Sequence, residues 1–119
     1  MRVKMRTNLE KRITGHWDVK QGEGGLIDAE FLTQYLCLLH AHNRPSLIAY
    51  TDNWRQLEAL ELEGLLTAAQ KEGLLAAERA YRGWLHRRAL QQLDALAEDG
   101  LFAAERATVS AQWKYFLGE

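Results

Sequence analysis

The sequence predicts an all-α fold, a bundle of about five helices in which a glycine-rich loop joins the first two. The chain has a single proline among its 119 residues. Good helix formers (Ala, Leu, Glu, Gln and Arg) dominate it, and it shows no sustained alternation of apolar and polar residues. Hydrophobic residues make up 47% of the chain, enough for a core without disulfides or metals. We therefore expect one helical domain over residues 1–119.

The first helix is expected over residues 1–13, and Gly15 ends it. This segment contains five basic residues and one acidic residue, so it is cationic. Residues 16–20 suit a short extended stretch, because Trp17 and Val19 alternate with polar neighbours. The glycines of residues 22–25 require a loop.

The second helix is predicted to begin near Asp28, a good N-cap residue, and to run to about His42. Its apolar residues cover most of its circumference, so it should be the buried central helix. Residues 43–45, with Pro45, break it, and residues 47–50 suit a short turn.

Residues 51–53 supply caps for a third helix, on which Trp54 shares one face with Leu57 and Leu60, as a core residue would. A capping box formed by Thr67 and Gln70 begins a long fourth helix, which is expected to reach about residue 97. The predicted inner stripe of this helix consists of Leu74, Tyr81, Leu85, Ala89 and Leu96.

On the outer side of the fourth helix, Glu78 and Arg82 are expected to form an exposed pair one turn apart. Asp99 and Gly100 are predicted to end the helix. The inner face of the last helix is expected to consist of Phe102, Val109, Trp113 and Phe116.

Composition narrows the function classes. The net charge of −1 indicates no general affinity for nucleic acid, and the only basis for such binding is the basic first segment. No apolar stretch approaches the roughly 20 residues of a membrane span, and no secretion signal is visible. The single cysteine, Cys37, lies in an apolar run and is expected to be a buried, inert thiol. These features favour a cytoplasmic protein.

The candidate residues for a binding site lie around the glycines. Lys20, Gly24 and Gly25 precede the second helix, and Asp28 and Glu30 lie at its start. Glycines allow backbone N–H groups to approach a phosphate, a helix N-terminus favours anions, and a lysine adds a positive charge. The spacing matches neither a Walker A motif nor a dinucleotide fingerprint. The alternative is a purely structural tight turn with Asp28 as a cap.

Other candidates are weaker. His40 and His42 point in different directions on a helix, so we expect no metal site from them. The basic run of residues 86–88 is either a solvated helix face or a contact for an acidic partner. Trp17, beside the glycine loop, is a candidate contact residue, whereas Trp84 and Trp113 suit the core.

Several strings resemble one family. Residues 20–35, which read KQGEGGLIDAEFLTQY, are similar to a hallmark of bacterial bifunctional glutamine synthetase adenylyltransferases. The strings AHNRP, TDN, LEAL, AYR and LHRRALQ follow in matching order at residues 41–45, 51–53, 57–60, 80–82 and 85–91. In the adenylyl-removing half and in the related uridylyltransferase an arginine tends to follow the glycine pair where this chain has Ile27. Ala29 also departs from the β-branched residue usual in the family, which is a packing change.

The resemblance implies that residues 1–119 form a C-terminal helical segment of the adenylylating half, which transfers AMP from ATP to a tyrosine of glutamine synthetase. Residues 1–27 would then form the seam with a catalytic core elsewhere in the protein, and residues 28–119 the bundle. The family's Gly-Ser motif and metal-binding aspartates have no match here, so we expect no catalytic residues, no metal ligands and no activity in this chain alone. ATP and Mg²⁺ would serve the whole enzyme, with Lys20, Gly24, Gly25, Asp28 and Glu30 next to the nucleotide or at the interdomain seam. The alternative is a module that docks glutamine synthetase or a nitrogen regulatory signal protein and contacts no nucleotide.

Overall fold

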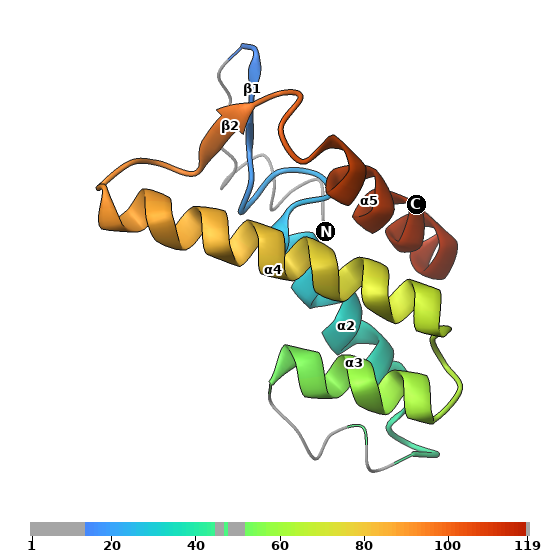
Figure 1. Cartoon of the computed structure of the whole chain (residues 1–119). Coiled ribbons are helices and arrows are strands. Elements are labelled where there is room, and N and C mark those ends of the chain that lie inside the picture. Colours follow the sequence, from blue (N-terminus) through green and yellow to red (C-terminus); the bar gives the residue numbers. More distant parts are fainter. Residues whose placement is uncertain (1–13, 45–46, 48–51, 119) are drawn as a thin grey trace.

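The fold is mostly helical, as predicted. A computed structural model describes residues 14–44, 47 and 52–118, so the helix expected over residues 1–13 and most of the turn expected at 47–50 lie outside the described residues. In Figure 1 the longest helix, α4, crosses the molecule, with α3 on one side of it and the strands and α5 on the other. The elements are β1 (His16–Asp18), α2 (Leu26–His40), α3 (Asn53–Leu62), α4 (Ala68–Leu90), β2 (Leu96–Glu98) and α5 (Ala103–Leu117).

The two strands form an antiparallel pair in which Trp17 lies opposite Ala97. The extended stretch expected near residue 17 is therefore confirmed, but its partner was predicted to be the end of a helix. The helix α4 ends at Leu90, and Leu96 belongs to β2 instead of to the inner stripe of α4. Asp99 and Gly100 lie in the turn after β2 and end no helix.

A Schellman motif ends α4. Gln92 adopts the left-handed conformation, with a φ of 59°, and its N–H donates to the carbonyl of Ala89 at 3.0 Å. The N–H of Leu93 donates to the carbonyl of Arg88 at 2.9 Å, which completes the motif. Glycine usually occupies this left-handed position, so a glutamine there gives almost no sequence signal. Gly64, with a φ of 77°, ends α3 in the same way.

The capping box at the start of α4 is confirmed. The Thr67 hydroxyl accepts from the N–H of Gln70 at 3.1 Å, and the Gln70 side chain accepts from the N–H of Thr67 at 2.9 Å. Both bonds satisfy donors that a helix N-terminus otherwise leaves unpaired, so the long helix has a defined start.

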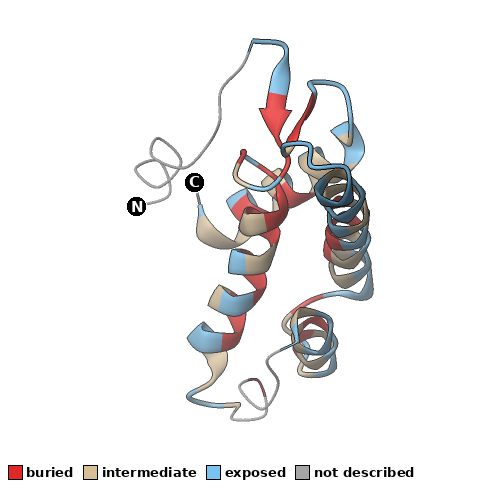
Figure 2. Ribbon diagram, turned by 90° about the vertical axis from the view of Figure 1, so that its left-hand side faces the viewer, coloured by how far each residue is buried: buried red, intermediate tan, exposed pale blue. Residues whose placement is uncertain are grey.

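The core lies where α2, α3, α4 and α5 meet, and α2 contacts all three other helices. Its central position is confirmed, but three of its apolar residues are exposed: Phe31, Leu38 and Leu39. Figure 2 shows the buried positions on the inward faces of the helices and at the end of β1. Of the last helix, Val109 and Trp113 are buried as expected. None of the described helices is long and apolar enough to cross a lipid bilayer.

Three predictions about side chains on α3 and α4 are wrong. Trp54 is 44% exposed, because the core of α3 is made by Leu57 and Leu60. Glu78 is fully buried instead of exposed, because it lies on the same face of α4 as Leu74 and Tyr81. On the predicted inner stripe Leu85 is only half-buried and Ala89 is exposed, since that end of α4 extends past the other helices.

Candidate functional site at the glycine loop

The glycine loop, residues 18–28, connects β1 to the first turn of α2. Gly25 is the N-cap of α2, so the helix begins at Leu26, earlier than the predicted Asp28 cap. Asp28 lies in the first turn instead, where its carboxylate reaches back and accepts from the N–H of Gly24 at 2.9 Å. An acidic residue also suits this position, because the helix N-terminus carries a partial positive charge. The predicted N-cap role of Asp28 is therefore wrong, because Gly25 is the N-cap and Asp28 lies three residues further along the chain.

Most backbone N–H groups of the glycine loop donate to acceptors inside the protein. Buried Asp18 accepts from Lys20 at 3.0 Å and from Gln21 at 2.9 Å through its carboxylate, and from Gly22 at 2.7 Å through its carbonyl. At the helix start, the N–H groups of residues 25–27 donate to carbonyls of the same loop at 2.9–3.0 Å. A phosphate cradle needs free N–H groups, so the loop is built as a self-bonded turn.

The glycines are required by close packing. A Cβ at Gly25 would overlap the carbonyl oxygen of Val19. A Cβ at Gly24 would lie 2.7 Å from the carbonyl oxygen of Arg106 on α5, and Gly24 also has a φ of 77°. These are backbone contacts that cannot move aside easily, so glycine is needed at both positions for steric reasons.

Two side chains from distant helices hold the glycine loop in place. The buried hydroxyl of Tyr81 on α4 donates to the carbonyl of Gly24 at 2.7 Å. Burial raises the pKa of this phenol, so it remains a donor at neutral pH. The Arg106 side chain on α5 donates to the carbonyl of Glu23 at 2.8 Å and lies 4.3 Å above the ring of Trp17. Trp17, a candidate contact residue, is buried, and its indole N–H donates to Leu101 at 3.1 Å.

Of the five candidate residues, the structure exposes Lys20 and leaves Glu30 partly exposed, while Gly24, Gly25 and Asp28 are buried. Glu30 forms an ion pair with Arg82 on α4, with 2.6 Å between its Oε2 and the Arg82 Nη2. The glycine loop therefore presents one cationic side chain, Lys20, on a rigid backbone.

The buried carboxylate of Glu78 connects the helices α2, α3 and α4. Glu78 on α4 accepts from the side-chain amide of Asn53, the first residue of α3, when that amide is oriented with its nitrogen toward the carboxylate. Its Oε1 lies 3.9 Å from the Nη2 of Arg82, which in turn pairs with Glu30 of α2. Burial raises the pKa of Glu78 to about 7, the positive charge of Arg82 opposes this rise, and the negative charge of Glu30 adds to it.

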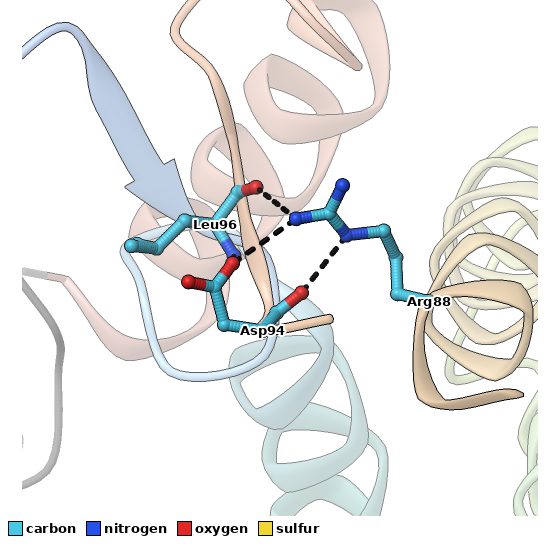
Figure 3. Close-up of polar contacts among 3 residues, drawn as sticks. All are labelled: Arg88, Asp94 and Leu96. Atoms are coloured by element: carbon cyan, nitrogen blue, oxygen red, sulfur yellow. Dashed lines mark hydrogen bonds and ion pairs between the residues drawn. The ribbon is translucent and has the colours of Figure 1, made fainter. Parts of the chain in front are cut away.

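Arg88 forms a contact that the sequence did not predict (Figure 3). It donates from Nε to the carbonyl of Asp94 at 2.9 Å, and from Nη2 to the Asp94 carboxylate at 3.0 Å and the Leu96 carbonyl at 3.4 Å. Its guanidinium also lies 4.9 Å from the ring of Trp84. These contacts bind the end of α4 to the segment before β2, and they depend on the Schellman turn that reverses the chain there.

The burial of Cys37 is confirmed, and burial raises the pKa of its thiol to about 11. A thiol with this pKa remains protonated at neutral pH and is a poor nucleophile. Among the described residues, no group of three or more His, Cys, Asp or Glu side chains is arranged to hold a metal ion.

Comparison with known proteins identifies relatives along almost the whole chain. Residues 1–117 match the family model described as GlnD PII-uridylyltransferase. Over 117 residues, which are 98% of the chain, the sequence is 43% identical to the bifunctional glutamine synthetase adenylyltransferase/adenylyl-removing enzyme of Nitrosococcus oceani. The chain spans 12% of the length of that relative.

Proposed function

This chain belongs to the GlnD PII-uridylyltransferase family, and from that membership we propose that it is a helical segment of the adenylylating half of a glutamine synthetase adenylyltransferase. The identity of 43% to a relative of that name supports the adenylylating activity over uridylylation. Ile27, which follows the glycine pair where an arginine is usual in the other half, supports the same assignment. The whole enzyme would act in the cytoplasm and transfer AMP from ATP to a tyrosine of glutamine synthetase.

In this proposal the reacting groups lie outside the chain. Nucleotidyl transfer relies on Mg²⁺ held by carboxylates and on precise positioning of the phosphates. ATP and Mg²⁺ would bind the catalytic core, so this chain by itself is expected to be inactive. Its contribution would be to close the nucleotide site and to fix the angle between the core and the bundle.

The observation that carries this role is the rigid glycine loop. Hydrogen bonds from α4 and α5 hold its backbone, and most of its own N–H groups donate to acceptors inside the protein. Because the loop is held in this way, the backbone at Lys20 has a fixed position at the surface. A residue that contacts a partner with a defined geometry needs such a fixed backbone. Gly24, Gly25 and Asp28 would act by shaping the loop, and Lys20 and Glu30 by facing the seam.

The test uses the full-length enzyme. Replacement of Lys20 by Ala is expected to lower the rate of adenylylation of glutamine synthetase, with thermal stability unchanged because the Lys20 side chain is exposed. Lys114→Ala, at an exposed position on α5, is the matched control and should leave the rate unchanged. Equal rates in both variants would contradict a role for Lys20 at the active site.

Exposed apolar residues on α2 favour a second candidate, the docking of glutamine synthetase or of a nitrogen regulatory signal protein. Phe31, Leu38 and Leu39 are 41%, 71% and 55% exposed, and all lie on one helix. Clustered exposed apolar surface is typical of a protein-binding site. Direct binding of either protein to the chain, abolished by Leu38→Ser, would support docking, and a failure of both proteins to bind would exclude it.

A further inference from the structure

An open groove of about 710 Å³ runs along α3, beside the first turn of α4. It lies on the opposite side of α4 from the two strands (Figure 1). Its walls combine large apolar side chains with several carboxylates. We call it the acidic groove, and its lining includes Trp54, Glu58, Glu61, Leu62, Glu63 and Lys71.

Two large apolar side chains of the acidic groove are exposed to water. Trp54 and Leu62 lie eight residues apart on α3, with Glu58 midway, so the three form one stripe along the helix. Leu62 is 85% exposed, more than any other large apolar side chain that the structure describes. Tryptophan is among the residues that contribute most to binding energy at protein interfaces. An exposed Trp–Leu pair two turns apart matches the contacts that a second helix makes when it packs along the first.

The acidic groove has more carboxylates than cations. Lys71 is shared between Glu61, with 2.9 Å from its Nζ to Oε1, and Glu72, with 3.4 Å. Glu58 is exposed and has no ion-pair partner within the described part of the chain. A cation from a partner can therefore bind here without displacing an existing pair. The other ion pairs at the groove are one to one: Arg44 with Glu63, and Arg55 with Asp52.

The position of these carboxylates is unfavourable for α3 by itself. The helix ends at Leu62, its last turn contains Glu61 and no basic residue, and Glu63 is its C-cap. A helix C-terminus carries a partial negative charge, so acidic side chains at that end destabilise the helix. A cationic segment bound in the groove would offset this repulsion.

We propose that the acidic groove docks a cationic amphipathic helix of a separate protein, with apolar side chains against Trp54 and Leu62 and with basic side chains on Glu58 and Glu61. Exposed charges of this kind speed the diffusional encounter of two separate molecules, which domains of one chain do not need. The chain's own cationic segment, residues 1–13, joins the fold beside β1, on the other side of α4 from α3 (Figure 1). The inference does not rest on the proposed function.

The binding test uses the 119-residue chain and a synthetic two-heptad peptide of leucine and lysine, with the leucines on one helical face. Binding is followed by the amide chemical shifts of residues 53–63 and 71. Saturable shifts are expected there, and the affinity should fall as salt is raised, because Glu58 is exposed. The same peptide with glutamate in place of lysine should not bind, because the groove repels it.

Matched variants locate the contact. Leu62→Ser should weaken peptide binding about tenfold, the loss expected when one leucine is no longer buried. Leu90→Ser, which changes an exposed leucine of α4 outside the groove, should leave the affinity unchanged. Glu58→Lys should weaken binding more than Glu58→Gln, because repulsion then replaces attraction. Glu98→Gln removes an exposed carboxylate of β2 and is the control for charge.

Several outcomes would overturn the inference. Equal binding of the glutamate peptide, or shifts centred outside α3, would exclude docking in the acidic groove. Equal losses with Leu62→Ser and Leu90→Ser would indicate unspecific apolar contact. Peptide binding to the 119-residue chain but not to the full-length protein would assign the groove to another part of the same protein. A dimer of the chain that Leu62→Ser dissociates would assign it to a second copy.

Discussion

Replacement of Glu78 by Gln should change how the stability of this protein depends on pH. Glu78 is fully buried, and burial raises its pKa from 4.5 to about 7. Between these pH values the folded state keeps a proton that the unfolded state has released. The contribution of Glu78 to the wild-type free energy of unfolding is therefore greatest below pH 4.5, and it falls as the pH rises toward 7.

The size of the effect follows from the same interval. At about 1.4 kcal/mol per pH unit, the interval from 4.5 to about 7 corresponds to about 3 kcal/mol. The Asn53 amide donates to the ionised carboxylate and so stabilises the charged form of Glu78. The value of about 3 kcal/mol is therefore an upper limit. A glutamine at this position keeps a side-chain oxygen for Asn53 and does not titrate.

The assay is urea unfolding of both proteins at pH 5, 6, 7 and 8, followed by tryptophan fluorescence. The wild-type free energy of unfolding minus that of Glu78→Gln should fall by up to about 3 kcal/mol between pH 5 and 8. Glu58→Gln, an exposed site on α3, is the control and should leave the slope unchanged. A difference between wild type and Glu78→Gln that stays constant over this pH range would refute the reasoning.

Three further substitutions probe the glycine loop and the start of α4. Tyr81→Phe removes the buried donor to the Gly24 carbonyl and should cost about 1–3 kcal/mol in chemical unfolding, and an unchanged midpoint would argue against that bond. Gly25→Ala forces a Cβ onto a backbone oxygen and should cost at least about 1–3 kcal/mol, whereas Gly100→Ala, with open space around it, should be close to neutral; equal effects would contradict the steric account. Thr67→Ala removes the cap of α4 and should lower the free energy of unfolding by about 1 kcal/mol, measurable as a fall in Tm; no fall would indicate that the box contributes nothing in solution.

Local sequence patterns predict some features of the candidate site and miss others. The glycine loop and its lysine are recognisable from sequence, because glycine and lysine at a helix start have a limited set of physical uses. Which use applies depends on where the loop N–H groups are bonded, and their partners include a buried carboxylate and the carbonyls of the same turn. The Tyr81 and Arg106 contacts join residues more than 50 positions apart in the chain, so no local pattern reveals them.

Four features of this protein can be predicted from sequence alone: the helical class, the capping box at Thr67, the short extended stretch at Trp17 and the family. Each depends on neighbouring residues or on strings of motifs. The replacement of the expected end of α4 by β2 depends on long-range contacts, because the left-handed Gln92 and the pairing with β1 outweigh helix propensity there. The burial of Glu78 had a visible sequence signal, the helical spacing of Leu74, Ala77, Glu78 and Tyr81. That signal is decisive only once α2 and α3 are known to cover the same face of α4, because a glutamate on an uncovered face would remain in water.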